Sequence, residues 1–181
     1  NRGVATAWDM GATHVLLSDH DSLPATDMLS ILHRTLASLE AAGKHVAAVG
    51  PMFSDRLRPS DSPFVRVVNG RFSRIEAGNA EAPLQLDCLI TSGSLISRAA
   101  WNAIGPMNEM LFIDYVDIEW GLRAQRLGWS CYGEPAAGMS HAIGSAPRRV
   151  LGRRITVHTP ARLYYQTRNA VFLMRHPDVP R

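Results

Sequence analysis

The chain has 181 residues, 46% of them hydrophobic, and a formal net charge of +3. This length is enough for one sizeable core and short for two, so we expect a single domain over residues 1–181. No stretch approaches the roughly 20 consecutive apolar residues that cross a bilayer. Cys88 and Cys131 lie far apart without a CxxC partner, which argues against a disulfide framework or a zinc knuckle and fits the reducing cytoplasm.

Arginine supplies nearly all of the basic charge, since Lys44 is the only lysine. Arginines are frequent in a basic C-terminal segment, residues 145–181, which includes Arg148 and Arg149. Such a segment could bind phosphates, nucleic acid or an anionic membrane surface, or it could be a solvated tail.

The first residues, NRGVATAWDMGA, have no initiator methionine. Val4, Ala7 and Trp8 repeat at helical spacing, and Gly11 ends the pattern. The chain thus begins in a helix already under way, and we expect it to be a piece of a longer protein.

Strands and helices alternate from there on. THVLLS and HVAAVGP are predicted buried strands, and between them residues 25–44 form a predicted helix that Gly43 ends. Asn69-Gly70, inside FVRVVNGRFSRIE, is a strong hairpin signal. LQLDCLITSGSLIS is a strand that runs into a turn of small residues, and WSCYG is a short strand. Further helices are expected at about 97–104, 114–128 and 160–175. This alternation predicts an α/β fold with a mostly parallel sheet flanked by helices and a local β-hairpin.

LLSDHDS, residues 16–22, places Asp19 and Asp21 where a buried strand ends. In an open α/β sheet the ligand site lies beyond the carboxyl ends of the strands, and side chains two residues apart in extended chain point the same way. The two carboxylates could therefore bind one hard cation or a set of sugar hydroxyls. The alternative is that they cap the helix after Pro24, a role that Ser22 could fill alone.

A second acidic group, in FIDYVDIEWGLRAQRLG, comprises Asp114, Asp117 and Glu119 at the start of a predicted helix. A structural interpretation makes Asp114 the N-cap, Asp117 its capping-box partner and Glu119 the partner of Arg123 at i+4. A functional interpretation makes one of these carboxylates the general base for an acceptor hydroxyl. The spacing does not decide between the two.

Five segments, in this order, resemble family 2 glycosyltransferases of the GT-A fold, and look most like the rhamnosyltransferase branch: LLSDHDS, LITSGSLIS, LFIDYVDIEWGLRAQRLGW, SHAIGS and HTPARLYYQTRNAVFLMRH. The similarity extends over nearly the whole chain. FIDYVDIEW and RLYYQTRN are its specific parts, whereas the Asp-x-Asp motif is shared much more widely. The resemblance implies an inverting transfer of a sugar from a nucleotide diphosphate donor, assisted by Mg²⁺ or Mn²⁺.

The resemblance also implies a metal site. Asp19 and Asp21 match the Asp-x-Asp motif, so Asp21 would bind the cation that bridges the donor phosphates, with Asp19 beside it. His141 matches a histidine that completes the metal site in related enzymes, where neutral imidazole suits Mn²⁺ better than Mg²⁺. A purely structural role for this histidine is equally open.

Asp117 matches the catalytic base of the family, which takes the proton of the acceptor hydroxyl, while Asp114 and Glu119 are second candidates that would orient the acceptor. The TSGS turn would let the backbone approach the donor sugar, unless it is simply the end of a strand. Arg148 and Arg149 would reach the diphosphate from a loop. The donor-binding candidates are thus Asp19, Asp21, Ser92, Gly93, Arg148 and Arg149.

One departure from the family concerns the N-terminus. In the family, a first strand and helix that contact the nucleotide base precede the segment with which this chain begins. We therefore expect an N-terminally truncated domain that is inactive alone. By resemblance, the donor is dTDP-rhamnose and the acceptor is a saccharide or a lipid-linked sugar at the inner face of a bacterial cell membrane. The product is a cell-surface polysaccharide, and no nucleic-acid partner is expected.

Two other functions remain open. Haloacid-dehalogenase-like phosphatases also begin with Asp-x-Asp after a buried strand, and there Asp19 would be the nucleophile and Asp21 the general acid. Those enzymes need a lysine near the transferred phosphate, and the position of Lys44 is wrong for it. A binding module without catalytic activity would show no metal dependence.

Overall fold

The computed structural model describes residues 1–55, 64–68, 71–75, 80, 82–141, 148–150, 153–155 and 159–175. At residues 55, 67, 68, 71, 72, 74, 141, 148–150 and 153–155 it describes the backbone alone.

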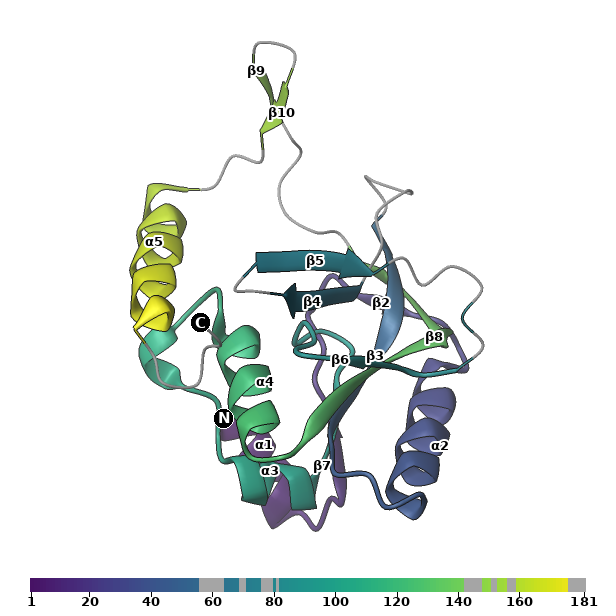
Figure 1. Cartoon of the computed structure of the whole chain (residues 1–181). Coiled ribbons are helices and arrows are strands. Elements are labelled where there is room, and N and C mark those ends of the chain that lie inside the picture. Colours follow the sequence, from purple (N-terminus) through teal and green to yellow (C-terminus); the bar gives the residue numbers. More distant parts are fainter. Residues whose placement is uncertain are drawn as a thin grey trace.

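A six-stranded sheet forms the centre of the described chain (Figure 1). The strands lie in the order β1, β7, β3, β8, β2, and β6 pairs with β8 on the same edge as β2. Their bounds are β1 His14–Leu16, β2 Leu23–Pro24, β3 Val46–Asp55, β6 Leu84–Leu86, β7 Leu95–Ser97 and β8 Ser130–His141.

The strand directions correct one expectation. β1, β3 and β8 run the same way, but β7 lies between β1 and β3 and is antiparallel to both. Of the pairs in the described part of this sheet, β3–β8 alone is parallel, so the sheet is mixed rather than mostly parallel. The reason is that the chain reaches β7 through a hairpin, β6 and a tight turn, whereas a parallel neighbour needs a long crossover, usually a helix.

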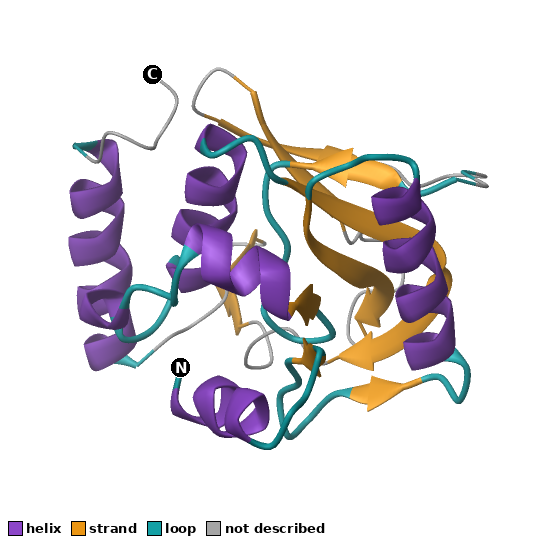
Figure 2. Cartoon of the chain, turned by 90° about the horizontal axis from the view of Figure 1, so that it is seen from below, coloured by secondary structure: helices purple, strands orange, loops and turns teal. Residues whose placement is uncertain are grey.

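Helices cover both faces of the sheet, which makes a three-layer α/β fold (Figure 2). α2, Met28–Ala41, packs on one face against Val46 and Val49 of β3. The other face carries Ala47 and Ala48, and there the cover comes from α1 Arg2–Asp9, α3 Arg98–Ile104 and α4 Val116–Arg126. The α/β class is confirmed.

The helical spacing of Val4 and Trp8 and the helix stop at Gly43 are confirmed as well. Met28, Leu32 and Leu36 of α2 are buried, and Gly43 has a left-handed φ of 76° just beyond the helix. This backbone conformation favours glycine and ends a helix. In α1 the buried residues are Val4 and Trp8.

The described residues also form two hairpins. β4 Phe64–Val68 and β5 Arg71–Ile75 are antiparallel, with Val68 opposite Arg71. The turn residues themselves lie outside the described residues. β9 Arg148–Val150 and β10 Arg153–Ile155 form a hairpin that the sequence did not predict, and it projects from the body of the molecule (Figure 1).

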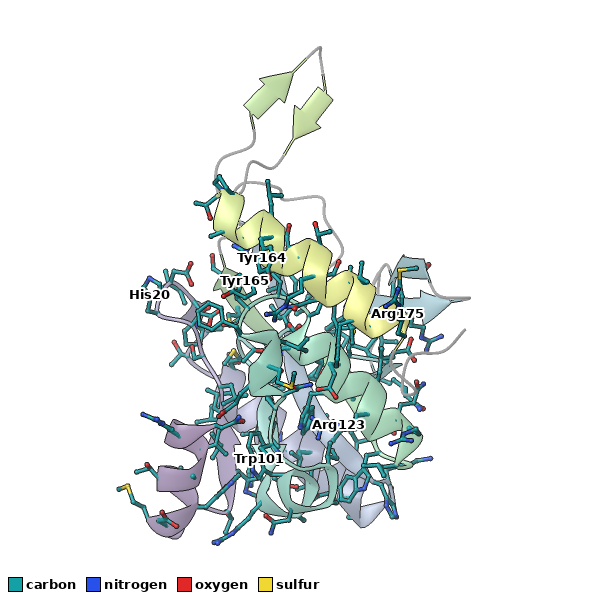
Figure 3. The ribbon with its side chains drawn as sticks, turned by 90° about the vertical axis from the view of Figure 1, so that its left-hand side faces the viewer. His20, Trp101, Arg123, Tyr164, Tyr165 and Arg175 are labelled. Carbon is teal, nitrogen blue, oxygen red and sulfur yellow. The ribbon has the colours of Figure 1, made fainter. Side chains whose placement is uncertain are left out.

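The last helix, α5 Pro160–Met174, follows as predicted, and the Thr159 hydroxyl at its N-cap accepts a hydrogen bond from the Arg162 backbone N–H at 3.3 Å. α5 lies on the outside of the molecule, running from Tyr164 and Tyr165 to Arg175 (Figure 3). Among the described residues, no helix combines the length and the hydrophobicity needed to span a membrane.

Candidate active site

The loop that carries Asp19 and Asp21 follows β1 and is exposed. It does not cap α2, because that helix begins only at Met28 with Asp27 at its N-cap position. The capping interpretation of the two aspartates is therefore wrong. Their exposure at the carboxyl end of a strand leaves the metal or sugar interpretation standing.

The TSGS turn holds this loop in place. The Ser92 hydroxyl accepts a hydrogen bond from the Asp19 backbone N–H at 3.1 Å and lies 2.6 Å from the Ser22 hydroxyl. The Gly93 N–H donates to the Leu17 carbonyl at 2.7 Å. These hydrogen bonds hold the TSGS turn and the loop after β1 together, although the two segments are about 70 residues apart in the sequence.

Position 93 requires a glycine, both for its backbone conformation and for lack of space for a side chain. Its φ is 81°, and a Cβ there would lie 2.6 Å from Cγ of Pro51. The space that the missing side chain leaves is filled by a proline ring, which supports the simpler interpretation of this turn as a tight strand connection. Buried Ser92, by contrast, lines the cleft described below.

Asp117 lies in the first turn of α4 and is half-buried. Burial raises the pKa of its carboxyl above the ordinary value, and the nearby charge of Asp114 adds to this effect. Hydrogen bonds from the backbone N–H groups of Ile118, at 2.9 Å, and Thr91 act in the opposite direction. A carboxylate with a raised pKa is a better proton acceptor than an exposed one.

A cleft of about 750 Å³ brings the predicted residues together. Asp19 and Ser92 line it beside Asp114 and Asp117, and Arg162 and Gln166 of α5 contribute to the same wall. A second, apolar cavity of about 270 Å³ also reaches Ser92 and Asp117, so the carboxylate lies where the two spaces meet. Convergent polar groups at a concave site are typical of a ligand site.

Asp114 is not the N-cap of α4, and the predicted capping box does not form. The N-cap position is Tyr115, with φ 65° and no side-chain cap, and the Asp117 carboxylate bonds its neighbour Ile118. The Asp114 carboxylate instead accepts two hydrogen bonds from the Arg162 guanidinium, at 2.8 and 3.0 Å. A long-range ion pair has displaced a local cap.

Glu119 has the structural role that its spacing predicts. Its side chain is 2% exposed, and its carboxylate accepts two hydrogen bonds from Arg123, at 2.9 and 3.1 Å. Arg123 also donates to the carbonyls of Ile104 and Pro106. This pair ties α4 to the end of α3 rather than lining the cleft.

Residues of α5 that the sequence analysis gave no role contact the loop before Asp117. The Asn169 side chain is fully buried, and its amide nitrogen lies within 3.0 Å of the carbonyl oxygens of Leu111, Ile113 and Asp114. The Arg168 guanidinium donates to the carbonyls of Met110 and Leu111. The only sequence signal was the motif RLYYQTRN, whose chemistry the spacing does not reveal.

His141 ends β8, and its backbone lies opposite Asp55 at the end of β3. β2 pairs with β8 so that Leu23 lies opposite Ser140. The end of β8 is therefore brought beside the segment that follows Asp21. The His141 side chain lies outside the described residues, as do those of Arg148 and Arg149, whose backbones belong to β9.

The described residues supply some, but not all, of the protein ligands expected for a hard divalent cation. Asp19 and Asp21 offer two carboxylates on one exposed loop, and Asp19 lines the cleft. Mg²⁺ and Mn²⁺ take oxygen ligands, and Mg²⁺ commonly uses one or two carboxylates with substrate phosphates supplying the rest. Among the described side chains, no three potential ligands gather in one place.

The phosphatase interpretation finds no support here. Lys44 follows the far end of α2, a helix of 14 residues and so about 21 Å long, whereas Asp19 precedes its near end. Lys44 does not line the cleft. The lysine that this chemistry needs is therefore missing from the site.

No family model matches the chain. It is 32% identical over 181 residues to a dTDP-rhamnosyl transferase, RfbF, of Shigella flexneri, a match that includes 99% of this chain and 60% of that protein. The chain thus spans about three fifths of the length of this relative.

A solved structure shares the fold. The crystal structure of GalNAc-T7 with UDP, GalNAc and Mn²⁺ matches 83% of this chain and 30% of its own, with a TM-score of 0.59 and 11% sequence identity. A likeness at this identity shows the fold alone. Together the two comparisons support the predicted resemblance: the chain is similar in sequence to a dTDP-rhamnosyl transferase, and it shares a GT-A-like fold with GalNAc-T7.

Proposed function

We propose that this chain forms the catalytic part of an inverting glycosyltransferase that moves a sugar from a nucleotide diphosphate to an acceptor hydroxyl. One observation carries the proposal: Asp19 and Asp117, which match the metal-binding motif and the base, line the same cleft. The likeness to a dTDP-rhamnosyl transferase over 99% of the chain supports the same reaction.

In this proposal Asp117 is the base. The acceptor oxygen attacks the anomeric carbon, its proton passes to the Asp117 carboxylate, and the bond between the anomeric carbon and the diphosphate oxygen breaks. The electron pair of that bond leaves with the diphosphate. Attack from the face opposite the leaving group inverts the anomeric configuration. The raised pKa of Asp117 supports this role, because it makes the carboxylate a better proton acceptor.

Asp19 and Asp21 would hold Mn²⁺ or Mg²⁺, which would neutralise charge on the departing nucleotide diphosphate. His141 is the proposed third ligand, on the basis of its place at the end of β8 beside the Asp-x-Asp loop. Ser92 would orient the donor from the cleft wall while holding Asp19 in place. Arg148 and Arg149 would contact the diphosphate from β9.

The proposed donor is dTDP-rhamnose, because the matched relative is named a dTDP-rhamnosyl transferase. The proposed acceptor is a saccharide or lipid-linked sugar at the inner face of the membrane, where the arginine-rich residues 145–181 would meet anionic lipid headgroups. Asp114 would help to orient this acceptor, since it lines the cleft beside Asp117.

Calorimetric binding of dTDP, UDP and GDP, with and without Mn²⁺, tests the proposal. The titrations use this chain and the longest natural form that contains it, with Asp21→Asn as the control. We expect dTDP to bind the long form only with metal, and the control to lose that binding. If no nucleotide binds either form, the transferase proposal fails. A covalent phosphate on Asp19 would then favour the phosphatase.

A further inference from the structure

The loop before Asp117 is strained. Phe112, Asp114 and Tyr115 have positive φ values of 62°, 62° and 65°, which residues other than glycine rarely adopt. Each such residue is energetically unfavourable and persists only where surrounding contacts enforce it. Three of them within four positions, directly before a helix, need an external support.

α5 supplies that support. Asn169 places one amide nitrogen within 3.0 Å of three loop carbonyls, so its two N–H groups serve all three. Arg168 donates to two loop carbonyls and stacks over Tyr165, with 4.8 Å between its guanidinium carbon and the ring centroid. Arg162 binds the Asp114 carboxylate in a bidentate pair.

The loop in turn sets where α4 begins. The Tyr115 carbonyl accepts the Glu119 N–H at 2.9 Å, the first hydrogen bond of the helix, and Asp117 lies in that same turn. The α4 N-terminus has no side-chain cap of its own. The path of residues 110–115 therefore decides the position of the Asp117 carboxylate.

We propose that α5 positions the base Asp117. Asn169 holds residues 110–115 in their strained path. Arg162 holds the same loop and neutralises the charge of Asp114 beside Asp117. This inference rests on the proposed function for the role of Asp117. It also gives RLYYQTRN a physical reason, because Arg162, Arg168 and Asn169 are its polar members that reach the loop.

The charge of Asp114 is the part that can be measured directly. The titratable groups that line the spaces around Asp117 are Asp19, Cys88, Asp114, Tyr115, Cys131 and Arg162. Of these, Asp114 raises the pKa of Asp117 by repulsion, and Arg162 pairs with Asp114 at 2.8 Å. Removing Arg162 leaves Asp114 unpaired, which raises the pKa of Asp117 further.

The test compares Arg162→Met, Arg162→Lys and the double variant Asp114→Asn/Arg162→Met in the longest natural form. The titration of the Asp117 carboxyl is followed by ¹³C NMR, and transfer is followed against pH. Arg162→Met should move the Asp117 midpoint to higher pH and lower kcat about 10- to 100-fold with a smaller change in KM. Arg162→Lys should restore the midpoint in part, and the double variant should return it towards wild type.

Arg123→Met is the matched control, because it breaks a second bidentate arginine–carboxylate pair, Arg123–Glu119, whose residues do not line the cleft. It should lower the melting temperature and leave the Asp117 midpoint unchanged. Asn169→Ala tests the positioning without changing any charge. Hydrogen exchange of the Glu119 amide, which makes the first hydrogen bond of α4, should accelerate at least tenfold more than exchange in the α2 helix. Equal acceleration in both helices would overturn the positioning role of Asn169.

The outcomes separate the two proposals. An unchanged Asp117 midpoint in Arg162→Met, or a double variant that titrates like the single one, would overturn the role of Arg162 even if the enzyme transfers rhamnose. A shifted midpoint without any transfer activity would support the positioning by α5 and count against the proposed reaction.

Discussion

Asp19 and Asp117 line one cleft from opposite parts of the fold, Asp19 from the exposed loop after β1 and Asp117 from the first turn of α4. Their surroundings differ. Asp19 is open to solvent, whereas Asp117 is half-buried beside an apolar cavity. Two carboxylates in such different environments suit two roles, with the solvated one holding a cation and the less solvated one accepting a proton.

Asp117→Asn is expected to separate activity from stability. The variant keeps the shape but loses the basic group, so transfer should fall about 10²- to 10⁴-fold while donor binding is retained. Because a partly desolvated charge is removed, the folded state should become about 0.5–2 kcal/mol more stable at neutral pH. Steady-state kinetics and thermal unfolding measure both effects. Turnover close to that of the wild type would rule out Asp117 as the base.

The pH dependence of transfer follows from the raised pKa of Asp117. Only the ionised carboxylate accepts a proton, so kcat/KM, which reports the free enzyme, should be constant at high pH and fall tenfold per pH unit below the pKa. The acidic limb should therefore lie above the ordinary range of aspartic acid. It should also disappear from the residual activity of Asp117→Asn, and a limb that persists there would assign it to another group.

The same pKa makes a prediction about stability. Between the ordinary pKa of aspartic acid and the raised pKa of Asp117, the folded chain binds more protons at this site than the unfolded chain does. The contribution of Asp117 to stability should therefore decrease as pH rises through that window and then level off. Subtracting the unfolding curve of Asp117→Asn from that of the wild type isolates this contribution, and the opposite slope would contradict the assignment.

Asp21→Asn should weaken donor binding only when Mn²⁺ is present. A lost charge-assisted contact of about 1.5–3 kcal/mol corresponds to roughly a 10- to 150-fold loss of affinity. Calorimetry with dTDP measures this, and Asp27→Asn provides the control, because Asp27 lies on the same chain segment at the start of α2. Equal affinities of the wild type and Asp21→Asn, with and without metal, would remove the metal assignment.

Gly93→Ala should damage the fold at the cleft. The new Cβ would meet Pro51 at 2.6 Å and would force a left-handed residue, at a combined cost of about 2–4 kcal/mol. Gly11→Ala is the control for φ alone, since no atom lies within 4 Å of a Cβ there. Urea unfolding of both variants separates the cost of the backbone conformation from the cost of the clash with Pro51. Equal losses of unfolding free energy would mean that Pro51 moves aside without cost.

Many of the helices and strands could be predicted from the sequence, because the patterns that specify them involve residues close together in the chain. The apolar spacing of α2 and the Asn69-Gly70 register of β4 and β5 both depend on neighbours in the chain. The direction of β7 could not be predicted in this way, because its pairing with β1 joins residues about 80 positions apart.

Some features of the candidate site could also be predicted from the sequence, whereas others depend on residues far apart in the chain. Resemblance singled out Asp19 and Asp117, and the fold brings them to one cleft. The capping interpretation of Asp114 was wrong because Arg162, far along the chain, forms an ion pair with its carboxylate. The strained loop gave no sequence signal, since Phe112, Asp114 and Tyr115 are not glycines. Tertiary contacts override local preference here.

The place of β7 has a consequence for how the chain folds. β1 and β3 cannot become neighbours on their own, because residues 95–97 must insert between them. On the ribosome the first half of the sheet therefore waits until β7 has been synthesised. Such non-local pairing gives a high contact order and slow folding. β8 is synthesised later still, pairs with β3 and packs against α2, so the sheet and its α2 layer should be completed only when β8 arrives.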